Sequence, residues 1–320
     1  MPRGFVFGTL RVPLVVFGVV TLTFLLLHFA PGDPVSHLLG PGATTDQIQT
    51  VREALGLERP LVVQYGRWLA RAVQGDFGAS IATGRPVLAM LWEAWPATAL
   101  LVGLSIVLSY TIGMLIAAVQ ATTRRRGVDG FLSGLTATLA ALPGYWLAFV
   151  LGMVFTYVLR WLPGFGAAGL DADYLRPGQR VMDRLAHLAL PLATLTLIGI
   201  GTTARYARGT LRAVAREPYL MLARAKGAGR WRVLFRHHLR NGLIPIVALL
   251  GLSLPALFSG AVFVEGVFAW PGVGTVLIQA VQSRDYPVVM AATTVSAIMV
   301  VLGSVLAEQL VYRVDPRTRA

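Results

Sequence analysis

The sequence predicts an all-α membrane protein with six transmembrane helices. Of its 320 residues, 55% are apolar and only 13% are charged, a composition outside the range of soluble domains. Six apolar segments are each long enough to cross roughly 30 Å of hydrocarbon as a helix. The basic residues gather in short connections between those segments, as they do in polytopic membrane proteins.

The first expected span covers residues 10–30 and follows Arg3 and Arg11, a start that resembles a secretory signal. It is longer than the roughly 7–15 apolar residues of a signal core and lacks an A-x-A cleavage pattern, so we expect it to be retained. The third contains Pro143-Gly144, where we expect a kink that either lines a transport path or is only structural. The fourth is the shortest. The remaining expected spans cover residues 97–121, 131–159, 188–203, 243–267 and 288–311.

The distribution of basic residues predicts the orientation of the chain. Its formal net charge is +13, with 28 Lys and Arg residues against 15 Asp and Glu residues. Placing both termini and the connections 122–130 and 204–241 in the cytoplasm puts 18 of those 28 basic residues on that side. This agrees with the positive-inside rule and predicts cytoplasmic N- and C-termini. The charge therefore indicates a lipid bilayer as the partner and argues against nucleic acid.

The boundaries divide the chain into a cytoplasmic N-terminus with the first span at 1–30, an external loop region at 31–96, a transmembrane core at 97–312 and a cytoplasmic tail at 313–320. In the external region, Thr44 or Thr45 precedes a periodic apolar pattern that predicts a short amphipathic helix. A second helical stretch runs on to Gly75. Three alternatives stay open for these helices: they lie on the membrane surface, form a lid, or only pack on the bundle.

Two groups of acidic residues outside the cytoplasm could be taken for functional sites. The second external connection carries Asp171, Asp173 and Asp183, and because a cation site needs more oxygen ligands than these supply, we interpret the connection as a solvated turn. Glu265 lies near the expected outer end of the fifth span, where it either has a function or extends to water. The apolar stretch 274–281 is too short to span, which favours a re-entrant or interfacial helix.

Motifs for catalysis are missing. The chain has no cysteine and no H-E-x-x-H, G-x-S-x-G or Walker pattern, so hydrolase, metalloprotease and nucleotidase functions have no motif support. Residues 199–204 match G-x-G-x-x-A by letters alone, but they lie in an apolar span without a preceding strand, which excludes a dinucleotide fold. The spans carry almost no ionisable residues. This favours a pore powered by partners over the alternative, a secondary transporter or channel with an intramembrane relay.

One cytoplasmic stretch, 205–240, holds ten basic residues and a single acidic residue, Glu217. Glu217 followed by Pro218 is typical of a helix start, because a carboxylate favours the positive helix end and proline fits the first helical position. Lys226 and Gly227 are typical of a helix end. The pattern therefore predicts a short capped helix of about two to three turns.

These residues resemble the EAA-loop signature of the inner-membrane subunits of binding-protein-dependent ABC importers, and specifically the peptide/nickel group of oligopeptide and dipeptide permeases. The signature lies in residues 223–227, 236–237 and 240–245. Further segments similar to the same group follow in order along the chain: 30–34 (APGDP), 75–78 (GDFG), 83–86 (TGRP), 270–274 (WPGVG), 284–287 (RDYP) and 315–317 (DPR).

The resemblance implies a type I ABC importer permease fold with a cytoplasmic coupling helix at about residues 212–228. It implies transport of di- or oligopeptides across a bacterial or archaeal inner membrane, with a homologous second permease subunit, two cytoplasmic ATPase subunits and an external solute-binding protein as partners. It also implies that ATP and Mg are bound by the ATPases, with no cofactor, metal site or catalytic residue in this chain. The residues implied to contact an ATPase are Glu217, Tyr219, Ala223, Arg224, Ala225, Lys226 and Gly227.

Overall fold

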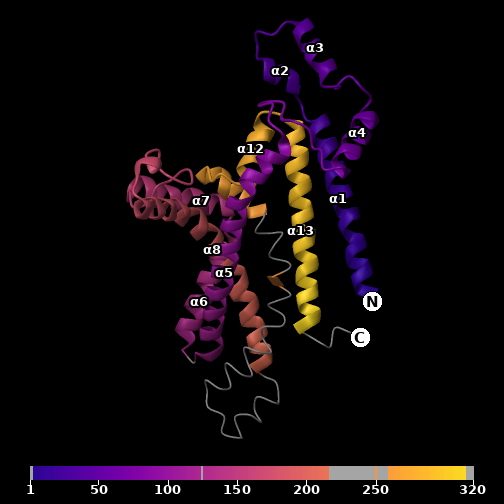
Figure 1. Cartoon of the computed structure of the whole chain (residues 1–320). Helices are drawn as coiled ribbons and strands as arrows, with labels where there is room; N and C mark the ends of the chain where they lie inside the picture. The colour runs from indigo at the N-terminus through magenta and orange to yellow at the C-terminus, as the bar shows by residue number, and fades with distance from the viewer. Residues whose placement is uncertain (1–2, 124, 216–248, 251–258, 315–320) are drawn as a thin grey trace. The chain divides into compact units, whose positions relative to one another are not determined.

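The computed structural model describes residues 3–123, 125–215, 249–250 and 259–314. Within these ranges the regular structure is helical, without a strand, and one isolated antiparallel bridge joins Ala79 and Pro86. The predicted all-α class is thereby confirmed (Figure 1).

The elements are α1 (Arg3–Phe29), α2 (Pro34–Leu39), α3 (Thr45–Ala54), α4 (Leu61–Val73), α5 (Val87–Thr122), α6 (Arg126–Ala141), α7 (Gly144–Gly152), the π-helix η1 (Met153–Val158), the 3-10 helix η2 (Ala172–Tyr174), α8 (Pro177–Ala215), a helix at Ser259–Phe268, α12 (Val273–Gln282) and α13 (Tyr286–Val314).

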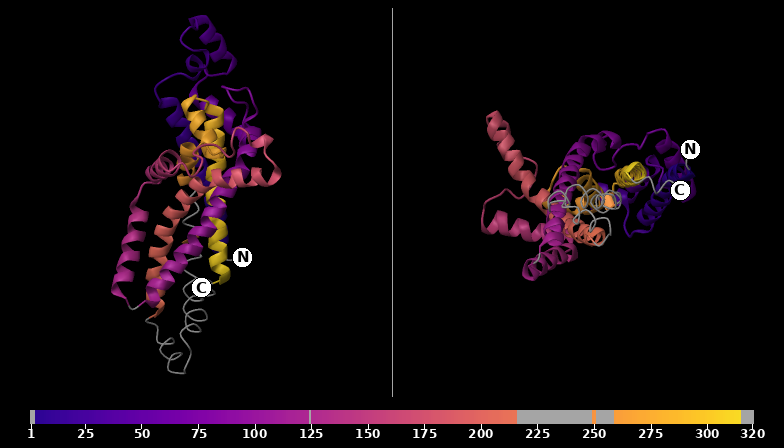
Figure 2. Two further views of the ribbon diagram at one scale, coloured as in Figure 1. Left: turned by 90° about the vertical axis from the view of Figure 1, so that its left-hand side faces the viewer. Right: turned by 90° about the horizontal axis from the view of Figure 1, so that it is seen from below.

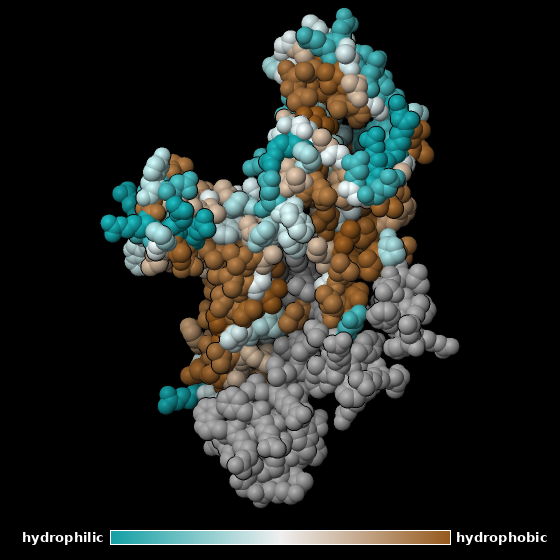
Figure 3. Space-filling model, in the orientation of Figure 1, coloured by the Kyte–Doolittle hydropathy of each residue, from teal (hydrophilic) through white to brown (hydrophobic). Residues whose placement is uncertain are grey.

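Four of these helices are long and apolar enough to cross a membrane, and up to six crossings result if each of two bent helix pairs counts as one. The four apolar segments are Val12–Phe29, Val87–Thr122, Pro177–Ala213 and Tyr286–Leu306. Exposed apolar side chains such as Leu26 on α1 and Leu115 on α5 suit lipid rather than water. In Figure 3 the spans are brown on the face shown, whereas teal residues gather over α3 and α4.

The third expected span changes direction at Pro143-Gly144 as predicted, but through a break between two helices and not through a kink within one. α6 ends at Ala141, α7 begins at Gly144, and the two helices differ in direction by 103°. Leu142 adopts an extended conformation with ψ of 132°, as residues before proline usually do. Pro143 then stands at the N-cap of α7, so it separates two helices instead of bending one.

The fourth expected span is the middle of α8, a helix of 39 residues that is far longer than the apolar segment alone. The fifth lies mostly outside the described residues, and its last part falls in the helix Ser259–Phe268. The short stretch at 274–281 is helical as predicted, in α12.

The chain forms two compact units, one of residues 3–98 with 271–301 and one of residues 99–270 with the remainder of α13. In the first unit, the initial turns of α5 pack with α12 and α13 around Val87, Leu91 and Val288. The hydroxyl of Thr98 accepts a hydrogen bond from the N–H of Val273 at 2.9 Å, which satisfies a backbone donor at the start of α12.

The two helices predicted in residues 31–96 are present, and one of them packs on the first span. Thr44 caps α3 in a capping box with Gln47. On α4, the ring of Tyr65 lies 5.0 Å from that of Phe24, and its hydroxyl lies 2.6 Å from the hydroxyl of Thr21 on α1. Of the three alternatives for this region, packing on the bundle is therefore observed for α4.

Asp33 joins α2 to α3. Its carboxylate accepts from the N–H of Ser36 at 2.9 Å and pairs with Arg52 at 3.0 Å. Burial raises the pKa of Asp33, but hydrogen bonds from Ser36 and the Arg52 guanidinium outweigh that effect and hold the pKa below its usual range. The carboxylate is thus ionised at neutral pH. Asp33 is the N-cap of α2, so its negative charge interacts favourably with the positive end of that helix.

Asp285 fixes the turn at residues 80–83 to the start of α13. Its carboxylate is only 2% exposed and accepts from the backbone N–H groups of Ile81 and Ala82 at 3.1 and 3.2 Å and from the Ser80 hydroxyl. The Ser80 oxygen in turn accepts from the N–H of Thr83 at 2.9 Å. A buried carboxylate is tolerated here because its oxygens are hydrogen-bonded.

In the second unit, α8 packs closely against α5 and α6, and Figure 2 shows it running alongside them. A Cβ atom at Gly201 would lie 2.5 Å from the backbone nitrogen of Ala140 on α6, and one at Gly199 would overlap Ser109 on α5. The Ser109 hydroxyl donates to the carbonyl of Thr196 at 3.1 Å. Small residues permit such approach in lipid, where packing drives helix association.

Replacing Gly201 with alanine should destabilise the protein, because the added methyl collides with the α6 backbone. We expect a loss of about 1–3 kcal/mol, the usual cost of overpacking. Gly209 on the same helix has open space around its missing Cβ, so Gly209→Ala should be neutral or stabilising by up to about 1 kcal/mol. The melting temperatures of both variants in detergent provide the comparison, and equal shifts would contradict the packing argument.

Replacing Asp285 with alanine should also destabilise the protein, at a cost of about 1–3 kcal/mol for each buried donor left without its acceptor. The stability of Asp285→Asn should lie between those of wild type and Asp285→Ala, since one carbonyl oxygen remains as an acceptor. The matched control is Asp173→Ala, because Asp173 is exposed and contacts Arg180 through its backbone carbonyl. Thermal melting in detergent measures all three, and an Asp285→Ala variant as stable as the control would refute the role.

Candidate functional site

The residues predicted to contact an ATPase, Glu217, Tyr219 and 223–227, lie outside the described residues. The structure does describe the helix that leads to them. The described part of α8 runs to Ala215, two positions before Glu217. The site can therefore be built from the last turns of α8 and from what holds them in place.

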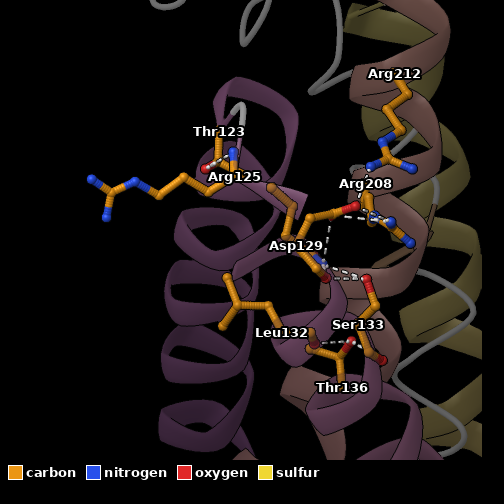
Figure 4. A network of polar contacts seen from close by, with 9 residues as sticks. Thr123, Arg125, Asp129, Leu132, Ser133, Thr136, Arg208 and Arg212 are labelled. Atoms are coloured by element: carbon orange, nitrogen blue, oxygen red, sulfur yellow. Dashed lines mark hydrogen bonds and ion pairs between the residues drawn. The ribbon is translucent and has the colours of Figure 1, made fainter. Parts of the chain in front are cut away.

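Two arginines of α8 converge on one carboxylate of α6. The Nη2 atom of Arg208 lies 3.0 and 2.9 Å from the two carboxylate oxygens of Asp129, and that of Arg212 lies 2.8 Å from Oδ2. Figure 4 shows both guanidinium groups turned toward Asp129 from successive turns of α8. Their i, i+4 spacing places them on one face of the helix.

Two more side chains connect Asp129 to α5. The Ser133 hydroxyl donates to the backbone carbonyl of Asp129 at 2.6 Å, and the amide of Gln120, near the end of α5, donates to the Ser133 oxygen at 3.0 Å. We call Gln120, Asp129, Ser133, Arg208 and Arg212 the Asp129 cluster. It joins the end of α5, the beginning of α6 and the end of α8.

The contribution of the Asp129 cluster to stability depends on its geometry. The side chains of Asp129 and Arg208 are 24% and 27% exposed, and that of Arg212 is 47% exposed. A single exposed ion pair contributes only about 0–1 kcal/mol. Here one carboxylate binds two guanidinium groups through three short contacts, so the relative direction of α6 and α8 is fixed more firmly than by one pair.

Asp129 has a second favourable contact with its own helix. It lies in the first turn of α6, where a negative charge is stabilised by the unpaired N–H groups of the helix start. Arg125, one turn earlier, extends away from the cluster in Figure 4. Arg125 at the N-cap of α6 is thus directed outward, whereas Asp129 in the first turn of α6 is directed at α8.

Glu265 occupies a different environment from the expected one. Its side chain is 0% exposed, so the idea that it extends to water is wrong. Its backbone carbonyl accepts from the N–H of Trp270 at 2.9 Å, and Ala269 between them has a left-handed φ of 49°. The helix thus ends in a tight turn directly after Glu265.

An apolar cavity of about 320 Å³ lies beside this turn. Its walls come from α7, the π-helix η1 and the end of the helix Ser259–Phe268, and include Phe149, Met153, Phe165 and Phe268. Such a lining can receive an apolar group, and its polar side chains are the hydroxyls of Thr156 and Tyr157.

The acidic external connection is held by Asp183. Its carboxylate accepts from the N–H of Gly169 at 2.8 Å and lies 3.3 Å from Nδ1 of His187. Asp171 and Asp173 are exposed. In the part of the chain that the structure describes, no three His, Cys, Asp or Glu side chains are grouped as metal ligands.

Sequence reasoning missed Asp129 and Asp285 as functional or structural centres. A signal was present for Asp129, because it is the single acidic residue in the basic connection 122–130 and Arg208 and Arg212 are four positions apart. For Asp285 the only signal was its place in the segment RDYP. Neither pattern identifies the residue on the other side of the contact.

Comparison with known proteins gives matches over nearly the whole chain. Residues 109–320 match the family model for the inner membrane component of binding-protein-dependent transport systems, and residues 3–102 match the model for the N-terminal part of such membrane components. The chain is 35% identical over 304 residues to the oligopeptide transport system permease protein AppB of Bacillus subtilis (strain 168), covering 95% of each. It is 35% identical to the probable D,D-dipeptide transport system permease protein DdpB of Escherichia coli (strain K12), covering 95% of this chain and 94% of the relative.

A third relative is the glutathione transport system permease protein GsiC of Escherichia coli O1:K1 / APEC, at 34% identity over 95% of this chain and 94% of that protein. Among solved structures, the MetNI methionine ABC transporter in inward-facing conformations matches with a TM-score of 0.55 at 15% identity, over 72% of this chain and 98% of that one. An amino acid ABC transporter matches with a TM-score of 0.53 at 13% identity, over 71% and 94%. These two structures support the type I importer fold. The chain therefore belongs to the inner membrane components of binding-protein-dependent transport systems and is a permease subunit of an ABC importer.

Proposed function

We propose that this permease forms half of the pathway by which di- or oligopeptides enter the cell. The observation that carries the proposal is the match over 95% of the chain to relatives whose names specify an oligopeptide and a D,D-dipeptide. A further relative is named for glutathione, which is also a small peptide. Because the chain belongs to this family, we no longer consider the alternative function of a secondary transporter or channel.

The proposed assembly contains a homologous second permease, two cytoplasmic ATPases and an external solute-binding protein. This chain carries no Walker pattern, so ATP and Mg belong to the ATPase subunits. The charge distribution supports placing both termini in the cytoplasm of a cell with an inner membrane. On that orientation, the stretch 205–240 faces the ATPases.

Within that stretch, the proposed ATPase contact is the capped helix that contains Glu217, Tyr219 and 223–227. Its sequence supports a rigid element, because Pro218 fits a helix start and Gly227 fits a helix end. A rigid helix can pass on the closure of the ATPases as a push, whereas a flexible loop would absorb it.

The assembly and its cargo can be tested together. Affinity purification of the tagged chain from native membranes should recover two ATPase subunits, a second permease and, at lower yield, a soluble binding protein. After reconstitution into proteoliposomes, labelled di- to pentapeptides should accumulate only when ATP and the binding protein are present. Uptake that proceeds without ATP, or ATP-driven uptake of nickel or oligosaccharides but not peptides, would exclude the proposed function.

Replacing Gly227 with leucine should uncouple the transporter. A bulky side chain disfavours the left-handed conformation that ends the helix, so peptide uptake should fall at least about ten-fold, equivalent to about 1.4 kcal/mol of lost coupling. ATP hydrolysis and membrane insertion should persist. Gly209→Leu is the matched control, because open space surrounds Gly209. Unchanged uptake in Gly227→Leu would rule out this role.

A further inference from the structure

We propose that Asp129 is a positioning residue for coupling: it clamps the end of α8 to α6 and α5, so that movement of the ATPase-contacting segment is transmitted to those helices. The proposal rests on the proposed function, because it concerns the route by which the coupling segment acts. Beyond that function, it names Asp129 and its contact with α8 as the place where movement passes from α8 to α6 and α5.

The position of the clamp is its first support. Arg208 and Arg212 lie on the last two turns of α8, immediately before the segment proposed to contact an ATPase. A force applied beyond Ala215 reaches these turns before any other described part of the helix. Whatever holds them decides whether the force bends the end of α8 or moves its neighbours.

The packing of α8 is the second support. Its middle is fixed at Gly199 and Gly201, where it lies against α5 and α6 with no room for a Cβ atom. Its end is fixed by Asp129, on the same α6 helix. Two separate attachments to one neighbour prevent α8 from turning about a single contact, so α6 and α8 should move as one body.

The chemistry of the contact is the third support. Asp129 receives three short contacts from two arginines, and its own backbone carbonyl is held by Ser133, which Gln120 of α5 contacts in turn. A carboxylate between two guanidinium groups fixes a direction, which a contact between apolar side chains does not. The chain of contacts therefore continues from α8 through α6 to α5.

Orientation alone does not explain this arrangement. Basic residues that only set topology need no partner, and Arg125 in the same turn is directed away from the cluster. Asp129 adds a negative charge where the positive-inside rule favours positive ones. Its value therefore lies in binding Arg208 and Arg212.

The first test measures coupling in the assembled transporter reconstituted in proteoliposomes. Asp129→Ala should assemble with its partners and hydrolyse ATP, but transport at least about five-fold fewer peptide molecules per ATP than wild type. Asp129→Glu should restore most of that ratio, since the longer carboxylate can still reach both arginines. Arg125→Ala is the matched control and should keep the wild-type ratio.

A second readout does not require the transported solute to be known. The chain has no cysteine, so nitroxide labels can be placed specifically at Val128→Cys on α6 and Gly209→Cys on α8, both exposed. With Asp129 present, the distance between the labels should be narrow and the same without nucleotide and with ATP bound. In Asp129→Ala it should broaden or shift when ATP binds.

The outcomes separate the two proposals. A wild-type complex without ATP-driven peptide uptake contradicts the proposed function, while the label distances still decide the role of Asp129. If the wild-type complex couples transport to ATP hydrolysis, and Asp129→Ala transports as much peptide per ATP and shows the same distances between the labels, the proposed role of Asp129 is contradicted and the proposed function is not. If Asp129→Ala fails to assemble, Arg212→Ala replaces it, because the half-exposed Arg212 contributes one contact of three. Assembly lost in that variant too would show a purely structural contact and overturn the proposal.

Discussion

The close approach of α8 to its neighbours is the constraint on which the second unit depends. Lipid provides little hydrophobic drive for helices to associate, so their contact must come from packing at short range and from polar groups satisfied between them. Gly199 and Gly201 remove the side chains that would otherwise separate α8 from Ser109 on α5 and from the backbone at Ala140 on α6. The letters G-x-G-x-x-A, which indicate phosphate binding after a strand, here serve helix packing. That packing also brings the end of α8 within reach of Asp129.

The long apolar helices could be predicted from the sequence because each requires only a run of apolar residues of sufficient length. The break at Pro143 could not be predicted with its 103° change of direction. The same Leu-Pro-Gly sequence is compatible with a kink or with a new helix start, and neighbouring helices decide between them. The length of α8 was missed for a related reason. Its first turns are polar and escape a hydropathy criterion, yet Arg180 and Asp183 attach them to the adjoining loop.

The candidate site likewise contains a part that could be predicted from the sequence and a part that could not. A role for residues 217–227 could be proposed from the sequence because helix-capping residues, charge and a family signature all occur within one short stretch, and these residues lie outside the described ones. The partners of Asp129 and Asp285 could not be assigned. Asp129 is separated from Arg208 by 79 positions, and Asp285 from Ser80 by 205. Such pairs depend on the fold, and no local periodicity specifies them.

A shared physical principle links these two carboxylates. Each lies at the start of a helix, where the unpaired N–H groups favour a negative charge, and each also binds donors from a distant segment. In both residues the two carboxylate oxygens accept hydrogen bonds from the distant segment. With only 15 acidic residues among 320, the chain uses two of them to join segments that are far apart in the sequence. The arginines then fall into two groups: for most of them we propose only a role in orienting the chain in the membrane, whereas Arg208 and Arg212 share the carboxylate of Asp129.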